Sequence, residues 1–216
     1  MHERGARHLV DPSKLLDSAT RLYGAAMDSL WGEVAPVPER NLIVLTGGEI
    51  LEAGGRAFEV AYTPGHASHH VSYFDRSSGI AFVGDTAGVC VNGGYVLPPT
   101  PPPDIDVELW LDSIQAIDRW QPSTLFLTHF GPVTSGVSAH LQALAGNLRR
   151  SAALVRESLG SQGTDEDRKS QYEAWMAAEL RSQMSEDMAK AYEMAAGFRM
   201  SWPGLARYWR KKERAA

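Results

Sequence analysis

The stretch TPGHASHHVSYFDRSSGIAFVGDT, residues 63–86, places three of the chain's seven histidines within five positions. His66, His69 and His70 follow a Pro-Gly pair closely, and the stretch ends with Asp85 between a glycine and a threonine. A polar loop with scattered imidazoles would have this composition, and so would a set of metal ligands. The rest of the sequence has to separate these two interpretations.

The composition is that of an ordinary globular protein: 216 residues, 44% hydrophobic and 22% charged, with a formal net charge of −5. This length fits one domain with a helical extension. The acidic balance argues against nucleic acid or an anionic membrane as a partner, because phosphate groups call for a basic surface. The single cysteine, Cys90, excludes an intrachain disulfide and suits a reducing compartment. Since no apolar run approaches a membrane span and the N-terminus lacks a signal core, we expect a cytoplasmic protein.

Hydrophobic periodicity predicts the order helix, strands, helix, strand, helices. A helix is expected over 11–31, capped by Asp11 or Ser13. Short strands joined by Gly-containing turns should follow: NLIVLT (41–46), EILEA (49–53), FEVAYT (58–63), HVSYF (70–74) and IAFVGD (80–85). The proline-rich PPTPPP at 98–103 is expected to be a stiff surface connection.

The second half of the chain is expected to be mainly helical. A helix over 104–120 precedes the apolar strand in STLFLTHFGP, and everything after about 138 has helical character. The fold class predicted is a layered α/β or α+β domain over 1–137, followed by a helical region over 138–216. Its basic tail, ARYWRKKERAA, is expected to be a solvated helix end, with a binding patch as the alternative.

Three polar residues stand where an apolar strand is expected to end in a loop. His66 follows FEVAYTPG, Asp85 follows IAFVG, and His129 follows TLFLT. Strands that end together deliver such side chains to one edge of a sheet, where functional sites are commonly built. Two imidazoles and a carboxylate are suitable ligands for zinc or a related divalent ion. The trio therefore favours a metal site over a polar loop.

The segments TPGHASHH, FVGDT and LTHFGP resemble the last three metal-binding motifs of the metallo-β-lactamase-fold hydrolases, and most closely the hydroxyacylglutathione-hydrolase-like branch. The separations of 19 residues between His66 and Asp85, and of 44 between Asp85 and His129, agree with that family. The resemblance implies a partial αββα sandwich with a helical C-terminal extension.

The resemblance also implies a role for each matching residue. His66 would ligate a first metal ion, Asp85 would bridge two ions as the central catalytic residue, and His129 would ligate the second ion. His70 would orient a neighbouring group by hydrogen bonding rather than bind metal. His69 is expected to face solvent, and Cys90 is assigned no role.

The activity implied is metal-assisted hydrolysis of an ester, thioester or related bond in a small-molecule substrate. The cofactor would be Zn²⁺, two ions in intact relatives, with Fe or Mn as alternatives. Tyr95, Trp110 and Trp175 are candidates for an apolar pocket wall, although aromatic residues at such positions are more often core. Whether the chain forms a homo-oligomer is left open.

The family's further motif, H-x-H-x-D-H, is absent from the sequence. The nearest candidates, His2 and His8, are six residues apart and no Asp-His pair follows them. The chain is therefore expected to begin after that motif, as a truncated hydrolase with weak activity or none and with exposed strand edges. The alternative is a degenerate, non-catalytic family member that serves as a binding or oligomerisation module.

Overall fold

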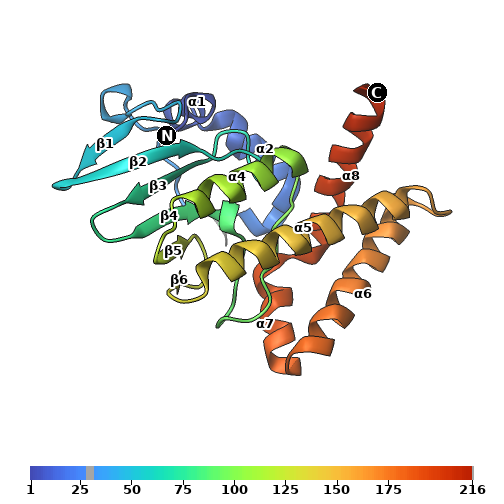
Figure 1. The fold of residues 1–216 in the computed structure, drawn as a ribbon. Coiled ribbons are helices and arrows are strands. Elements are labelled where there is room, and N and C mark those ends of the chain that lie inside the picture. The colour runs from blue at the N-terminus through green and yellow to red at the C-terminus, as the bar shows by residue number, and fades with distance from the viewer. Residues whose placement is uncertain (28–31, 216) are drawn as a thin grey trace.

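The computed structural model describes residues 1–27 and 32–215, in which helices flank a sheet (Figure 1). The chain opens with α1 (Glu3–Val10) and α2 (Ser13–Tyr23), followed by two 3₁₀ turns, η1 (Gly24–Ala26) and η2 (Glu39–Asn41). The helix expected over 11–31 ends earlier than predicted, because Gly24 adopts a φ of +53°, outside the α-helical region. Positions 28–31 of that expected helix lie outside the described residues.

Within the described residues, six strands form one sheet in sequential order. They are β1 (Ile50–Ala53), β2 (Arg56–Tyr62), β3 (Val71–Asp75), β4 (Ile80–Gly84), β5 (Thr124–Leu127) and β6 (Pro132–Val133). Strands β4 and β5 are parallel, and all other neighbouring pairs are antiparallel. Consequently β2, β4 and β5 run in the same direction, and their carboxyl ends lie along one edge of the sheet.

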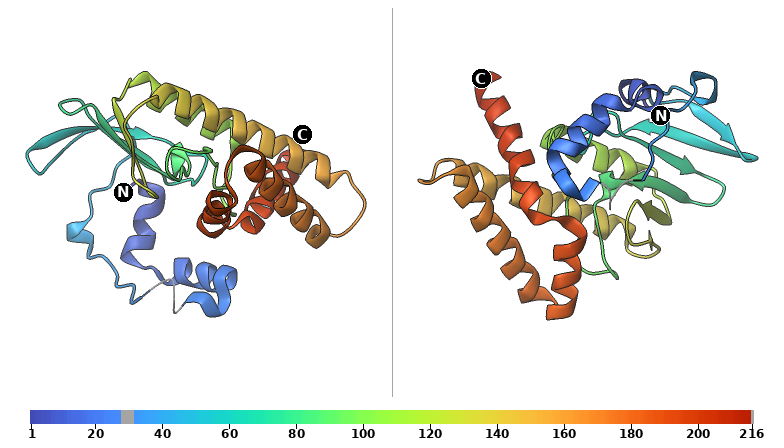
Figure 2. Two further views of the ribbon diagram at one scale, coloured as in Figure 1. Left: turned by 90° about the horizontal axis from the view of Figure 1, so that it is seen from below. Right: turned by 180° about the vertical axis from the view of Figure 1, so that it is seen from behind.

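The two faces of the sheet differ in how they are covered. Ala81, Val83 and Leu125 are fully buried in the core, whereas the alternating Phe82 and Phe126 are each 40% exposed. This alternation follows from the two-residue period of a strand. Figure 2 shows α4 (Val107–Arg119) and α5 (Val137–Leu159) along the buried face, with α1 and α2 on the opposite side.

The prediction of a strand at 41–46 is wrong. This segment holds only an isolated bridge between Leu45 and His2, and Ile43 and Val44 are largely exposed. Its partner backbone is the short extended stretch that ends at Glu3, whose N–H donates to the Leu45 carbonyl. A ladder cannot continue past that point, because the partner turns into α1 there.

The proline-rich connection is only partly a surface segment: Pro98 is buried, whereas Pro103 is exposed. The Thr100 side chain is buried and its hydroxyl donates to the Ser201 carbonyl, 3.2 Å away, on the last helix, α8 (Phe198–Ala215). Gly204 of α8 allows this contact, since a Cβ there would lie 2.0 Å from the Thr100 carbonyl oxygen. The connection is therefore clamped beneath α8.

The helical part comprises α5, α6 (Asp165–Gln183), α7 (Glu186–Ala196) and α8. Its apolar residues join those of the sheet in one hydrophobic cluster, which includes Tyr95 and Trp110, with Trp175 packed at its margin. The division at 137/138 stays a prediction. No helix among the described residues is long and apolar enough to cross a bilayer.

Candidate metal centre

The structure brings His66, Asp85 and His129 together at the carboxyl edge of the sheet. The Nε2 atom of His66 lies 3.7 Å from Oδ2 of Asp85, and Nε2 of His129 lies 3.6 Å from Oδ1 of the same carboxylate. Each histidine thus faces a different oxygen. The three residues follow β2, β4 and β5, the strands that run in the same direction.

Asp85 owes its position to an irregularity at the end of β4. The register with β5 shifts between Phe82 and Gly84, and Gly84 has a φ of +53°. A Cβ at Gly84 would lie 2.3 Å from Nε2 of His70, so both the backbone angle and the space require glycine. Asp85 then begins a short 3₁₀ turn, η3 (Asp85–Ala87), which directs its carboxylate at the two imidazoles.

His66 is held rigidly from two sides. Its Nδ1 lies 2.9 Å from the Pro99 carbonyl oxygen, and its ring stands edge-on to that of Trp110 with centroids 5.4 Å apart. A carbonyl oxygen only accepts, so Nδ1 carries the hydrogen and the lone pair of the neutral ring is on Nε2, which faces Asp85. The imidazole is therefore oriented as a metal-binding histidine needs to be.

The exposures of the three side chains differ in a graded way. His66 is 15% exposed, Asp85 27% and His129 53%. The site therefore opens toward solvent on the His129 side, beyond the end of β5.

The donor chemistry and spacing fit a divalent ion between each histidine and its carboxylate oxygen. Two ligands that are each about 2.0–2.2 Å from a tetrahedral ion lie roughly 3.4 Å apart, close to the separations of 3.6 and 3.7 Å. Each such ion would have only two protein ligands, however. In the part of the chain that is described, no group of three or more His, Cys, Asp or Glu residues is arranged to hold one ion.

His70 lies behind this site rather than in it. Its Nδ1 is 2.9 Å from both the Thr63 and the Thr86 hydroxyl oxygens. Thr86 is the neighbour of Asp85 and also accepts a hydrogen bond at its carbonyl from the Trp110 indole. His70 thus ties the loop after β2 to the turn that carries Asp85.

His69 does not face solvent, contrary to the sequence-based expectation. It is half-buried beneath α1, where Gly5 lets the helix approach, since a Cβ at Gly5 would lie 3.1 Å from the His69 Cβ. Burial lowers the pKa of its ring.

Two supporting residues escaped sequence reasoning. Nε2 of the buried His140, in α5, donates to the Ala87 carbonyl at 2.8 Å and so fixes the end of η3. The Tyr192 hydroxyl, in α7, donates to the Tyr95 carbonyl and accepts from the Val91 N–H. Both lie on apolar helix faces far along the chain, so no local pattern marks them.

Cys90 is buried, and burial raises the pKa of its thiol, which agrees with an inert residue.

We expect His70 to make folding sensitive to acid. Burial lowers the pKa of His70 to about 3, with smaller contributions from His66 and His69. An unfolded histidine titrates near about 6.5, so between these values the unfolded chain binds the extra proton. The free energy of unfolding should therefore fall as the pH drops through this window, by up to about 1.4 kcal/mol per pH unit.

Urea unfolding at several pH values between 7 and 4, in the presence of chelator, measures this effect. His70→Gln should have a shallower dependence on pH than the wild-type chain. An identical pH dependence in the two proteins would show that His70 titrates normally.

Comparison with known proteins agrees with this geometry. The family model of the metallo-beta-lactamase superfamily matches residues 4–129. A metallo-beta-lactamase fold-containing protein of Sulfurisphaera tokodaii is 31% identical over 132 residues, which cover 61% of this chain and 49% of that protein. A hydroxyacylglutathione hydrolase of a Synechococcus species is 36% identical over 72 residues, covering 32% of this chain and 26% of that protein. The matched part of the chain thus spans about half or less of these curated relatives.

Solved structures show the same fold. A metallo-beta-lactamase superfamily protein from Sulfolobus tokodaii superposes with a TM-score of 0.62 and 23% identity, over 94% of this chain and 68% of that one. A metallo-beta-lactamase family protein from Thermus thermophilus superposes with a TM-score of 0.63 and 18% identity, over 99% and 66% of the two chains. At these identities the likeness concerns the fold, and it confirms the predicted layered α/β class.

The chain belongs to the metallo-beta-lactamase superfamily. The similarity to a hydroxyacylglutathione hydrolase supports the branch that the motifs indicated.

Proposed function

We propose that the chain carries the metal-binding edge of a hydrolase that cleaves an ester, thioester or related bond. The observation that supports this best is the convergence of His66, Asp85 and His129 from three strands that run in the same direction, with one carboxylate between two imidazoles. Superfamily membership supports a hydrolase-type function.

The residues present suggest a division of roles. His66 would hold one divalent ion and His129 another, while Asp85 would bridge them through its two oxygens. The chemistry that such ions supply when bound is activation of water and polarisation of the carbonyl or phosphoryl group under attack. Zn²⁺ suits this nitrogen and oxygen donor set, and Fe or Mn are the alternatives.

The supporting residues would maintain this arrangement. The Pro99 carbonyl and Trp110 keep the His66 ring in place, and His70 and His140 fix the turn that begins at Asp85. Because His70 stays neutral at physiological pH, it adds no positive charge beside the ion.

A thioester is the substrate class that we propose first. The support is the similarity to a protein named hydroxyacylglutathione hydrolase, which concerns the stretch of the chain that matches it. A second candidate, a non-catalytic binding module, is favoured by the finding that no group of three or more His, Cys, Asp or Glu side chains among the described residues could hold one ion.

A hydrolysis assay separates the two candidates. The chelator-treated chain is supplied in turn with Zn²⁺, Fe²⁺ or Mn²⁺ and offered a hydroxyacylglutathione thioester, a simple aliphatic thioester and an aryl ester. We expect weak turnover that requires the ion and is absent in Asp85→Asn. Bound metal without turnover of any of these substrates would overturn the hydrolase proposal and favour the binding module.

A further inference from the structure

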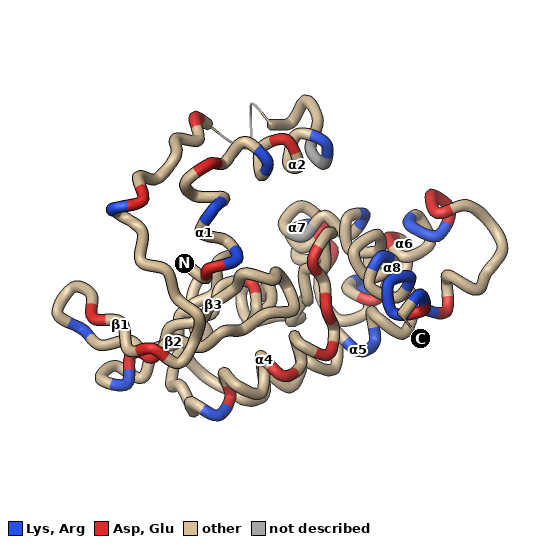
Figure 3. Tube along the Cα trace, turned by 90° about the horizontal axis from the view of Figure 1, so that it is seen from above, with Lys and Arg blue, Asp and Glu red and all other residues tan. Residues whose placement is uncertain are grey.

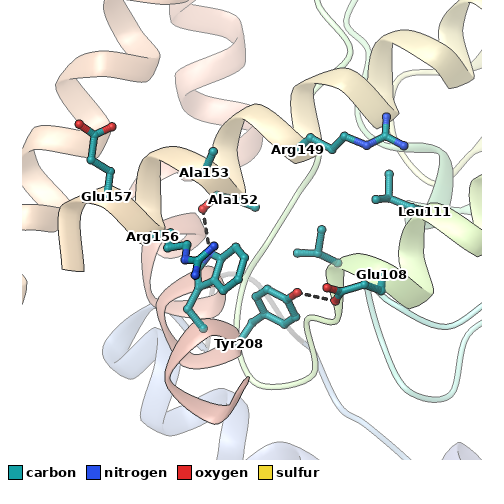
Figure 4. Close-up of a pocket in the computed structure, with 10 residues that line it drawn as sticks. Glu108, Leu111, Arg149, Ala152, Ala153, Arg156, Glu157 and Tyr208 are labelled. Atoms are coloured by element: carbon teal, nitrogen blue, oxygen red, sulfur yellow. Dashed lines mark hydrogen bonds between the residues drawn. The ribbon is translucent and has the colours of Figure 1, made fainter. Parts of the chain in front are cut away.

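A groove separate from the metal centre lies between α4, α5 and α8 (Figure 4). Its volume is about 520 Å³, within the range of small-molecule sites. Apolar side chains form most of its surface, among them Val107, Leu111 and Ala152, together with the rings of Tyr208 and Trp209.

The aromatic wall of the groove is fixed before any ligand arrives. The Trp209 indole donates to the Ala152 carbonyl at 2.8 Å, and the Tyr208 hydroxyl donates to the Glu108 carboxylate. The two rings pack edge to face with centroids 4.8 Å apart. A rigid wall lowers the entropy cost of binding, because few side chains must be ordered.

Among the cationic residues that line the groove, Arg149 differs in that its side chain has no partner among the described residues. Glu108 is neutralised by the Lys212 ammonium, and the Arg156 guanidinium is stacked 4.7 Å from the centre of the Trp209 ring. The Arg149 side chain, two turns before Arg156 on α5, takes part in no hydrogen bond or ion pair within the described ranges. Figure 4 shows Arg149 at the opposite end of the groove from Glu157, which is the second acidic residue of the lining.

The charged residues of the three helices around the groove are also unevenly distributed. Figure 3 shows Lys and Arg along α8 and on the adjoining part of α5, and Asp and Glu along α4. Because Glu108 is paired with Lys212, the lining charges left without an ion pair among the described residues are those of Arg149, Arg156 and Glu157, and their sum is positive. An unpaired guanidinium beside a fixed apolar wall is complementary to a carboxylate that carries a hydrocarbon body.

We propose that this groove binds a small organic anion with an apolar body, of the class of medium-chain carboxylates. The carboxylate pairs with Arg149, and the hydrocarbon lies along Leu111 and Ala152 toward Trp209. The proposal is independent of the metal centre, because none of its residues belongs to the ligand trio.

Calorimetric titration with octanoate, in the presence of chelator, tests the proposal on the full chain. We expect a dissociation constant of roughly 0.1–1 mM for a ligand of this size. Arg149→Gln should weaken binding about tenfold or more through loss of a charge-assisted pair. Ala153→Phe, which fills the groove from an exposed position on α5, should abolish binding.

Two controls give the result its specificity. Arg119→Gln, which removes an exposed arginine from the last turn of α4 outside the groove, should bind octanoate as the wild type does. Octan-1-ol should bind more weakly than octanoate. No binding of octanoate up to about ten times the expected constant, equal binding of alcohol and acid, or unchanged affinity in either groove variant would overturn the proposal.

Discussion

Asp85→Asn should lose zinc binding almost completely. Asp85 is the residue that both His66 and His129 face, each through a different oxygen. Asparagine keeps the shape but removes the charge and replaces one oxygen with an N–H₂ donor, so neither ion retains a carboxylate. Loss of an outer contact to a metal ligand already costs about 10–100-fold in affinity, and we expect loss of this shared ligand to cost at least about 100-fold.

Calorimetric titration of the chelator-treated proteins with Zn²⁺ measures this loss. Asp112→Asn, an exposed aspartate on α4, removes the same charge away from the site and should bind zinc as the wild type does. Equal affinities in Asp85→Asn and the wild type would show that zinc binds elsewhere.

Gly65→Ala should be the most damaging small substitution near the site. Gly65 has a φ of +128°, and a Cβ there would lie 2.3 Å from the Cα of Trp110 and 2.4 Å from its amide nitrogen. The backbone of α4 would have to move, which adds about 1–3 kcal/mol of overpacking to about 1–2 kcal/mol of backbone strain. His66, the next residue, would move with it and weaken metal binding.

We expect Gly65→Ala to lower the free energy of unfolding by about 3 kcal/mol. At about 2–4 °C of Tm per kcal/mol, thermal unfolding should then show a decrease in Tm of roughly 6–12 °C. The matched control is Gly48→Ala, which also has a positive φ, +95°, but no atom within 4 Å of the added methyl group. Its Tm should fall only by the part that backbone strain causes. Equal losses in the two variants would mean that the contact with Trp110 does not restrict this position.

The part of the site that the sequence predicted is the part encoded locally. His66, Asp85 and His129 each follow an apolar run that ends in a loop, and the shared direction of β2, β4 and β5 brings such positions to one edge. The hairpin turns and the long helices are encoded in the same local way, through Gly-containing turns and helical periodicity.

What the sequence did not predict depends on contacts between distant segments. The segment 41–46 has strand composition, but its partner backbone ends at Glu3. The connection at 98–103 is held against α8 because Gly204, about a hundred residues later, lets that helix approach. His69 is covered by α1 for the same kind of reason, and the contact of His140 with the Ala87 carbonyl spans 53 residues. Local propensity cannot reveal such pairings.

Anomalous diffraction at the zinc absorption edge, measured on zinc-soaked crystals of the chain, tests the metal centre itself. We predict zinc density about 2.0–2.2 Å from His66 Nε2 and from Oδ2 of Asp85, or at the corresponding place between Oδ1 and His129. Zinc density found only elsewhere, at His2 or His8 for example, with none beside Asp85, would contradict the assignment of these residues as metal ligands.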